Sequence, residues 1–327
     1  MKNSQPLRMI AIPGKLMLGG EYAVLRSDGA CVAVAVGVVV RAQLGLATPA
    51  PALELQAFGQ SWQWAGGQAP ETGLAQLCAA ALEALRDRHG ISPAHDLDFE
   101  VGGNVGGAKV GLGTSAAVTV AALRAALQSH SLATGAAQWA PADIAALARS
   151  VHGAGQAGRG SGYDVTVIAH GGVIWYEREP DRATALAWPQ GLYGAALFTG
   201  SPAATGAALA RAAIPDAALD DIRNACLDLH AAWSGPVRHI LRALSGCEAA
   251  FDVAAAADPG LLPAEVQDLR DLIAECGCVA RTSGAGGGDC VLALADDPER
   301  VQMAVQLWRS CAGSTVARLP EDLAPAS

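Results

Sequence analysis

Lysine, aromatic residues and long apolar runs are all scarce in this 327-residue chain. Aromatic residues make up 5% and charged residues 16% of the sequence, and only Lys2, Lys15 and Lys109 are lysines among 22 basic residues. The formal net charge is −9. Nucleic-acid phosphates require a broad basic surface, so this balance argues against a nucleic-acid partner. An anionic ligand would have to be held by a few locally placed cations.

No apolar run is long enough to cross a membrane. The longest covers Ala30–Val40, whereas a bilayer core of about 30 Å needs about 20 residues. Residues 2–8 are mostly polar, so we expect no secretory signal there. The eight cysteines show no paired metal-ligand spacing, and reduced thiols are their simplest interpretation. We therefore expect a cytoplasmic protein without membrane contact.

The order of the expected elements predicts an α+β protein. Strand-like runs dominate the first third of the chain, and helical runs mixed with strands follow. The length suggests about two domains, and turn residues cluster at residues 180–191, so we expect domains at 1–185 and 186–327. The principal expected helices are Leu74–Arg88, Thr114–Ser129, Pro141–His152, Ala203–Ala212, Asp216–Ala232, Gly235–Ala254 and Glu299–Arg309, and the stretch Gly153–Gly162 is expected to be irregular.

The strongest local signal is the glycine-rich segment Gly106–Ser115, which leads into a predicted helix. Glycines allow backbone N–H groups to approach an anion closely, and the start of a helix adds further N–H groups and the positive end of its dipole. The hydroxyls of Thr114 and Ser115 could cap the helix or reach a Mg2+ ion. The segment is not a Walker A loop, because Lys109 precedes the last two glycines. An ordinary strand-to-helix loop remains an alternative.

Two further segments place charged groups beside glycines. Lys15 follows Gly14 in an otherwise apolar strand pattern, where a buried cation needs an anion or partner; a lysine reaching to solvent is the alternative. Asp164 follows the glycine-rich stretch 158–162 and could act as a general base, or simply cap a turn. Arg159 and Ser161 lie beside Asp164 and could hold an oxyanion.

The last glycine-rich segment is Ser283–Asp289, between two predicted strands. Its backbone N–H groups could contact a substrate phosphate. A plain hairpin turn is the alternative, although the segment is longer than a tight turn requires.

Together these segments resemble the GHMP kinases, the group of galacto-, homoserine, mevalonate and phosphomevalonate kinases. The three motifs of that family match, in order, the segments Pro13–Glu21, Gly111–Ala117 and Ser283–Cys290. The resemblance is most detailed to the phosphomevalonate kinase branch, through Gly20–Leu25, Lys109 and the stretch from His152 to Asp164.

The resemblance implies a two-domain fold with the active site in the cleft between the domains. It implies ATP and Mg2+ as cofactors, a phosphorylated small molecule as acceptor, and a monomer or homodimer. Asp164 would be the catalytic base, Lys15 its cationic partner, and Ser115 the residue nearest the metal. ATP would contact Lys109, Gly111, Leu112, Gly113, Thr114, Ser115 and Ala116, and the acceptor would contact Lys15, Lys109, Arg159, Ser161, Gly162, Ser283, Gly284, Ala285 and Gly286.

Three departures from the family pattern leave other functions possible. Thr114 replaces the usual serine, Leu197-Phe198 precedes Thr199 where tryptophan is common, and Gln156 lies where mevalonate kinase has a metal-binding glutamate. The expected reaction is phosphorylation of phosphomevalonate to diphosphomevalonate, in isoprenoid precursor synthesis. The alternatives are a kinase for mevalonate, another hydroxy acid or a sugar, and a non-catalytic sensor with this fold.

Overall fold

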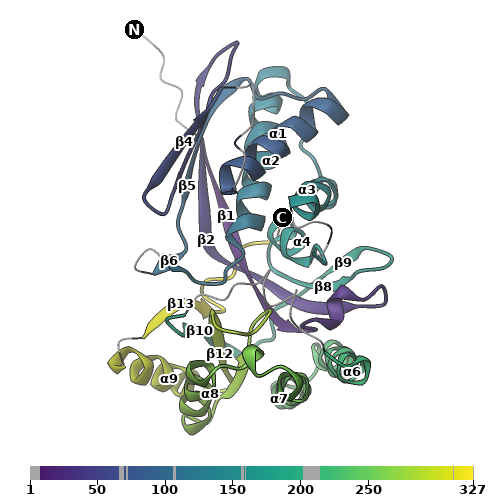
Figure 1. Ribbon diagram of the computed structural model, residues 1–327, viewed down its shortest axis with the longest axis vertical. Helices are drawn as coiled ribbons and strands as arrows, with labels where there is room; N and C mark the ends of the chain where they lie inside the picture. Colours follow the sequence, from purple (N-terminus) through teal and green to yellow (C-terminus); the bar gives the residue numbers. More distant parts are fainter. Residues whose placement is uncertain are drawn as a thin grey trace.

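A seven-stranded sheet forms the upper half of the computed structural model, which describes residues 8–65, 70, 73–105, 108–155, 158, 160–201, 214–311 and 313–326 (Figure 1). Its strand order is β4-β3-β5-β2-β8-β9, and β1 pairs with β2. All neighbours are antiparallel except β3 and β5. The strands are β1 (Met9–Gly19), β2 (Ala30–Ala47), β3 (Leu53–Ala57), β4 (Gln60–Trp64), β5 (His95–Val101), β8 (Val173–Glu177) and β9 (Arg182–Leu186).

Four helices lie on one face of this sheet (Figure 1). They are α1 (Gly73–His89), α2 (Thr114–Thr134), α3 (Pro141–Gly155) and α4 (Tyr163–His170). Helix α2 is central, because it packs on β1, β2 and β5 and also contacts the other three helices. Its alanine, valine and leucine side chains are buried on nearly all sides, as expected for a helix that is apolar around its circumference. The start of α2 is therefore held rigidly.

The end of the chain returns to the first sheet. Val36 of β2 forms a β-bridge with Leu323, the Ala324 N–H donates to the Ala35 carbonyl, and the Gly37 N–H donates to the Asp322 carbonyl. This contact lies between the part of β2 that pairs with β8 and the part that pairs with β5. The C-terminal segment thus ties the last strand of the chain to the first sheet.

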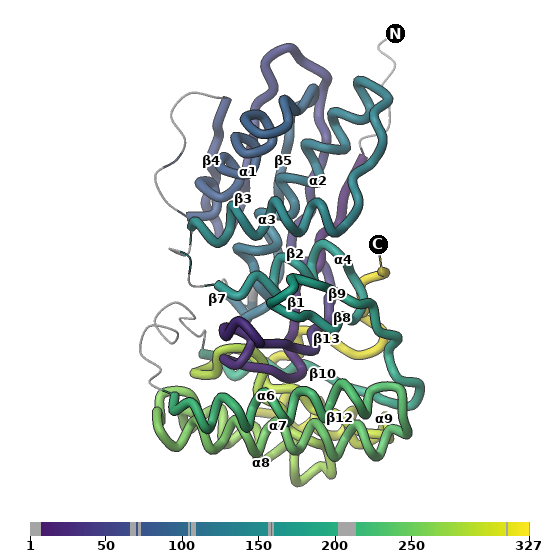
Figure 2. The backbone as a smooth tube through the Cα atoms, turned by 90° about the vertical axis from the view of Figure 1, so that its right-hand side faces the viewer, coloured from purple at the N-terminus to yellow at the C-terminus, as the bar shows by residue number. Residues whose placement is uncertain are grey.

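The lower half contains a four-stranded antiparallel sheet with the order β11-β12-β10-β13. Its strands are β10 (Tyr193–Phe198), β11 (Val279–Thr282), β12 (Cys290–Ala295) and β13 (Ser314–Leu319), and its helices are α6 (Asp216–Ala232), α7 (Val237–Ala257), α8 (Ala264–Glu275) and α9 (Pro298–Ser310). Helices α6 and α7 run side by side across the base of the molecule (Figure 2). Helix α6 also packs on β1, β2 and the short helix η1 (Ala23–Leu25), so it joins the two halves.

The structure confirms the α+β class and corrects several expected elements. Helix α3 continues to Gly155, so the first residues of the stretch expected to be irregular are helical. Asp164 lies within α4, which the sequence did not reveal because its apolar run is short and follows many glycines. The expected helix 203–212 lies outside the described residues. The boundary at 185–186 stays a prediction; β9 ends at Leu186 and β10 begins at Tyr193.

Among the residues with described positions, no helix combines the length and apolar character needed to cross a bilayer.

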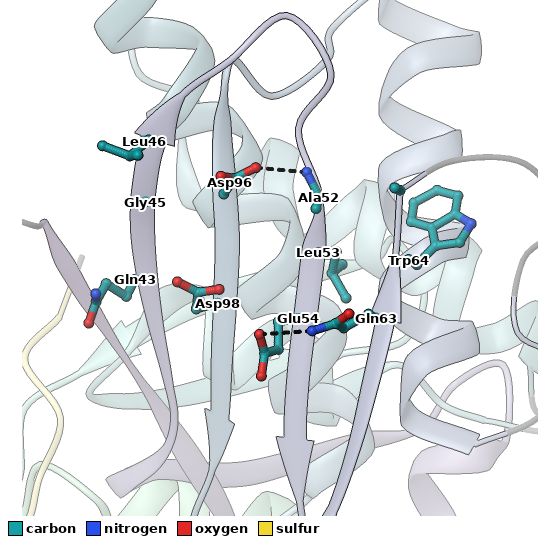
Figure 3. Close-up of a pocket in the computed structure, with 11 residues that line it drawn as sticks. Gln43, Gly45, Leu46, Ala52, Leu53, Glu54, Gln63, Trp64, Asp96 and Asp98 are labelled. Atoms are coloured by element: carbon teal, nitrogen blue, oxygen red, sulfur yellow. Dashed lines mark hydrogen bonds between the residues drawn. The ribbon is translucent and has the colours of Figure 1, made fainter.

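A groove of about 530 Å³ crosses the face of the first sheet that is turned away from the helices (Figure 3). Side chains alternate along β5, so Leu97 is buried in the core while Asp96 and Asp98 line the groove. Glu54 of β3 is the cross-strand partner of Asp98. The groove is therefore acidic, and it would repel a nucleotide triphosphate.

The close carboxylates of Asp98, Glu54 and Asp96 predict that removing the charge of Asp98 stabilises the protein. Partial burial, followed by the charges of Glu54 and Asp96, raises the pKa of the Asp98 carboxyl. A carboxyl with a raised folded-state pKa loses stability as the pH rises through its titration range, so ionised Asp98 destabilises the protein at neutral pH. We expect Asp98→Asn to increase the unfolding free energy at pH 7 by about 0.5 kcal/mol, the usual size of a cross-strand charge effect, and this can be measured by chemical denaturation.

The gain should shrink as the pH is lowered below about 4, because Asp98 then becomes protonated in both the folded and the unfolded state. Asp96→Asn is the control, since the Asp96 Oδ1 accepts the Ala52 N–H at 2.9 Å and its replacement weakens that bond. A loss of stability in the Asp98→Asn variant at pH 7 would contradict the prediction.

Candidate active site

Lys15 reaches into the glycine-rich loop from the middle of β1. Its Nζ donates to the Gly111 carbonyl at 2.9 Å, and its backbone N–H donates to the Leu112 carbonyl at 3.0 Å. The side chain is half-buried. Its ammonium group also lies 5.9 Å from the centre of the ring of Tyr163, the residue that precedes Asp164 in the sequence. The cation that the sequence singled out is thus fixed beside the predicted phosphate loop.

Two glycines of the loop are required by its geometry. Gly111 and Gly113 both have φ near +75°, a conformation that side chains rarely adopt. A Cβ atom on Gly113 would lie 2.9 Å from Cγ of Lys15, and one on Gly111 would lie 2.5 Å from Cβ of Asp289. The loop is therefore in close contact with β1 on one side and with the segment before β12 on the other. Gly106 and Gly107 lie outside the described residues.

Helix α2 starts directly after this loop. Gly113 is its N-cap residue and has no side chain that could bond to the N–H groups of the first turn. Those N–H groups have no partner within a helix, so they are available to an anion, and the helix dipole adds to the attraction. Thr114 and Ala116 are buried in this turn, whereas Ser115 is only partly buried. This arrangement is suited to binding phosphate oxygens.

Asp164 lies at the start of α4, after Gly162 with φ +80°. One carboxylate oxygen accepts the Val165 N–H at 2.8 Å, and the other lies 3.6 Å from Nδ1 of His152. The opposite ring nitrogen of His152 lies 3.0 Å from the Ser115 hydroxyl. Asp164 is therefore separated from the start of α2 by a single imidazole ring. In the described part of the chain, no hydrogen bond or ion pair joins Asp164 to Lys15.

The loop before Asp164 is held from behind by Arg149 and Tyr176. Arg149 packs so closely that a Cβ on Gly162 would lie 2.5 Å from its Cδ. The Tyr176 hydroxyl donates to the Ser161 carbonyl at 3.0 Å. Burial raises the pKa of this phenol, so it remains a neutral donor. Arg159 lies outside the described residues.

The third glycine-rich segment touches β1 and its neighbour Tyr22. The Met17 N–H donates to the Ser283 hydroxyl at 3.0 Å, and the Tyr22 hydroxyl donates to the Ala285 carbonyl. A Cβ on Gly284 would lie 3.7 Å from Nζ of Lys15. Gly286 has φ +68° and packs against the Leu261 carbonyl. The first and third motifs therefore meet at the junction of the two halves.

A buried ionic cluster fixes this junction, and the sequence did not reveal it. Arg281 is fully buried and pairs with the carboxylates of Glu21 and Glu248, and its Nε donates to the Leu18 carbonyl at 3.0 Å. Glu248 also accepts the Thr282 N–H at 2.9 Å. Burial raises the pKa of Glu21, although Arg281 opposes the shift. Glu21 ends the first matched motif and Arg281 lies just before the third, but their pairing could not be read from their positions.

Lys109 is exposed in the hairpin of β6 (Asn104–Val105) and β7 (Ala108–Lys109). Its ammonium group lies 5.6 Å from the centre of the Phe58 ring. Phe58 has φ +52°, which is unusual for a bulky residue. Asp289, beside Gly111, is another non-glycine residue with positive φ. The sequence assigned no role to Phe58 or Asp289.

Two family models match the chain: the GHMP kinases N terminal domain at residues 76–172, and the GHMP kinases C terminal model at residues 248–311. This chain belongs to the GHMP kinase family. It is therefore a kinase, a phosphotransferase, and the family implies ATP binding. The N-terminal match contains the glycine loop, the start of α2 and Asp164, and the C-terminal match contains the third motif.

One sequence relative supports the same assignment, and two solved structures share the fold. A phosphomevalonate kinase of Streptomyces sp. (strain CL190) is 27% identical over 87% of this chain and 88% of its own length. The solved phosphomevalonate kinase of Streptococcus pneumoniae, in complex with phosphomevalonate and AMPPNP, has a TM-score of 0.80 at 18% identity, covering 95% of this chain and 99% of the other. A mevalonate kinase of Methanococcus jannaschii has a TM-score of 0.76 at 15% identity, covering 96% and 98%. The two structures share the fold of this kinase.

The loop geometry predicts that Gly113→Ala will impair nucleotide binding. The new methyl group would displace Lys15, and the residue would also have to keep its positive φ, which costs about 1 kcal/mol. We expect the dissociation constant of an ATP analogue to rise by at least about 10-fold, a loss of about 1.4 kcal/mol, when measured by calorimetry.

Gly135→Ala is a matched control at the other end of α2. Gly135 also has φ +75°, but nothing lies within 4 Å of its Cβ position. This variant should lose stability without losing nucleotide affinity. Equal affinity losses in both variants would show that backbone strain, and not contact with Lys15, is responsible.

Proposed function

We propose that this kinase transfers the γ-phosphoryl group of ATP to the phosphate of phosphomevalonate, with ADP and diphosphomevalonate as products. The observation that carries the proposal is the arrangement at the start of α2, where Lys15 enters the glycine loop and Asp164 lies one imidazole ring away. The choice of acceptor is supported by the Streptomyces relative, which is named a phosphomevalonate kinase. The reaction belongs to the mevalonate route to isoprenoid precursors.

In this reaction the bond between the γ-phosphorus and the bridging oxygen of ATP breaks, and a new bond forms to an oxygen of the acceptor phosphate. Both reactants are anionic, so charge neutralisation and placement dominate catalysis. The Lys15 ammonium and the N–H groups at the start of α2 would neutralise the transferred group. Asp164 would orient the acceptor phosphate, or accept its last proton, since a phosphate needs less activation than an alcohol.

A Mg2+ ion fits the donor chemistry only in part. Mg2+ prefers oxygen ligands and commonly takes them from substrate phosphates with few protein groups. Among the described residues, no group of three or more His, Cys, Asp or Glu side chains could hold a metal ion. Ser115 offers an oxygen beside the proposed phosphate site. We propose that Ser115 would hold the ion together with the nucleotide phosphates, where it would reduce the charge on the transferred group.

We also propose that the enzyme works in a reducing compartment such as the cytoplasm. All eight cysteines are free, and all but Cys311 are buried. Burial raises the pKa of Cys78 to about 12, so this thiol stays protonated and unreactive.

The acceptor assignment predicts a selective effect of Lys109→Ala. Lys109 is an exposed lysine that the proposal assigns to the acceptor phosphate. Its loss should raise KM for phosphomevalonate by about 10-fold or more, the usual cost of one charge-assisted hydrogen bond. The KM for ATP should rise less, although Lys109 is also expected to contact ATP. ADP release can be measured with phosphomevalonate, mevalonate, homoserine and galactose as separate acceptors.

The wild-type enzyme should turn over phosphomevalonate in this comparison. If it instead turns over mevalonate or a sugar, and Lys109→Ala leaves the KM for that acceptor unchanged, the phosphorylated acceptor is wrong and an alcohol acceptor takes its place.

Asp164→Asn should separate binding from chemistry. The amide keeps the size of the carboxylate but loses its charge and basicity, so kcat should fall by about 10²–10⁴-fold while nucleotide affinity changes little. Asp143→Asn is the control, because Asp143 also lies in the first turn of a helix, α3, but is exposed to solvent. Equal kcat values in the wild-type enzyme and the Asp164→Asn variant would remove Asp164 from the mechanism.

A further inference from the structure

His152 connects two predicted site residues that belong to different helices. It lies in the last turn of α3, and only 3% of its side chain is exposed. Its Nε2 lies 3.0 Å from Oγ of Ser115 on α2, and its Nδ1 lies 3.6 Å from Oδ2 of Asp164 on α4. The first distance is a hydrogen bond, and the second is an ion-pair distance that is longer than a hydrogen bond. Each ring nitrogen therefore faces one of the two residues.

The neighbours of the ring determine where its proton lies. An ionised carboxylate can only accept, so the Nδ1 that faces Asp164 should carry the N–H of a neutral imidazole. Nε2 is then unprotonated and accepts the Ser115 hydroxyl proton. In the part of the chain with described positions, Nε2 is the only hydrogen-bond partner of that hydroxyl. The Ser115 oxygen consequently has lone pairs, and no proton, to offer to a ligand.

We propose that His152 is a positioning residue that orients the Ser115 oxygen as a cation ligand and links this orientation to the Asp164 carboxylate. A hydroxyl that donated its proton to a phosphate could not be oriented in this way. Because the hydroxyl proton is hydrogen-bonded to the imidazole, the Ser115 oxygen can coordinate a cation but cannot donate a hydrogen bond to a phosphate oxygen. This proposal rests on the proposed roles of Ser115 and Asp164.

A second histidine–serine pair, His95 of β5 with Ser129 of α2, makes a similar contact in a purely structural role. Nδ1 of His95 lies 2.9 Å from the Ser129 hydroxyl, which also accepts the N–H groups of Ala94 and His95. Ser129 is fully buried near the far end of α2 and serves the backbone. Ser115, by contrast, is partly exposed beside the glycine loop, and its histidine faces a carboxylate.

Two substitutions separate the roles of the two ring nitrogens. In His152→Gln the longer side chain places an amide near the Nε2 position, where its carbonyl can accept the Ser115 hydroxyl, but the group facing Asp164 is lost. In His152→Asn the shorter side chain places an amide N–H near the Nδ1 position and loses the contact with Ser115. His95→Gln is the matched control: His95 bonds Ser129 of α2 through Nδ1, a position that glutamine does not mimic, so this variant loses an imidazole–serine contact of α2.

We expect the His152→Asn variant to bind an ATP analogue about 10-fold more weakly with Mg2+ present, and with little change when Mg2+ is absent. The His152→Gln variant should keep nucleotide affinity within about three-fold, but kcat should fall by about 10–100-fold, the usual effect of removing a group that orients a site residue. His95→Gln should lower the midpoint of thermal unfolding without changing either quantity. Calorimetry with and without Mg2+, together with steady-state kinetics, provides these values.

The tautomer can be read independently of activity. A nitrogen–proton correlation spectrum of the imidazole rings in the intact, 15N-labelled enzyme should show His152 with protonated Nδ1 and unprotonated Nε2. Protonation at Nε2 would overturn the proposal, because Ser115 would then be an acceptor of the imidazole proton. Equal effects of the two His152 variants on nucleotide affinity and kcat would also overturn it, as would effects no larger than those of His95→Gln.

These outcomes are distinct from failure of the proposed function. The kinetic comparison can use any acceptor that the wild-type enzyme phosphorylates, and the binding and tautomer measurements need no acceptor. If phosphomevalonate is not a substrate, the role of His152 is still tested by the Mg2+-dependent loss of nucleotide affinity.

Discussion

The pairing of Arg281 with Glu21 and Glu248 is the interaction on which the geometry of the site depends. These three side chains come from β11, from the turn after β1 and from α7, and all three are buried. Removing one partner from a buried ion pair leaves an uncompensated charge and commonly costs 3–5 kcal/mol. The relative position of β1 and β11 is therefore strongly constrained. Because Lys15 lies on β1 and Ser283 follows β11, the same pairing sets the distance between two of the three motifs.

Small residues then allow the motifs to approach one another. The Lys15 side chain passes where a Cβ on Gly113 would lie, and Asp289 passes where a Cβ on Gly111 would lie. Three segments distant in the chain can thus bring backbone groups to one point. The rigidity comes from elsewhere: α2 is buried along most of its length, and the C-terminal segment bonds to β2. The glycines of the site, which can adopt unusual backbone conformations, are thus held by rigid helices and strands, as a preorganised site requires.

The parts of the site that depend on local pattern could be predicted from the sequence. The glycine loop and the start of α2 form one continuous signal, and Lys15 was conspicuous because lysine is so rare here. The fold class was predicted for the same reason, since most strands and helices have clear periodicity. Short elements were missed: α4 has eight residues and follows a glycine-rich stretch, and its role as the carrier of Asp164 became visible only in the structure.

The contacts that connect distant residues could not be predicted. Arg281 and Glu21 are 260 positions apart, and Ser115 and His152 are 37 positions apart. No periodicity links such residues, because their proximity follows from how the helices and sheets pack. In the sequence His152 belongs only to a resemblance, whereas its position between Ser115 and Asp164 supports the positioning role proposed for it. The roles assigned to Lys109, Ser161 and Arg159 stay predictions.

The net charge of −9 explains why the site has this form. A protein with an excess of carboxylates does not attract ATP or an anionic acceptor through its overall field. One acidic groove on the first sheet even lies on the same half of the molecule as the glycine loop. We therefore infer that recognition comes from short-range groups that act only once the ligand has arrived, and we propose the N–H groups at the start of α2 and the ammonium of Lys15 for this role. Such groups discriminate by geometry, since an anion gains their interaction only when its oxygens occupy the right positions. In-line phosphoryl transfer also requires its reactants to be placed accurately. The scarcity of cations and the chemistry of the reaction therefore both favour a site that holds phosphate oxygens at fixed positions.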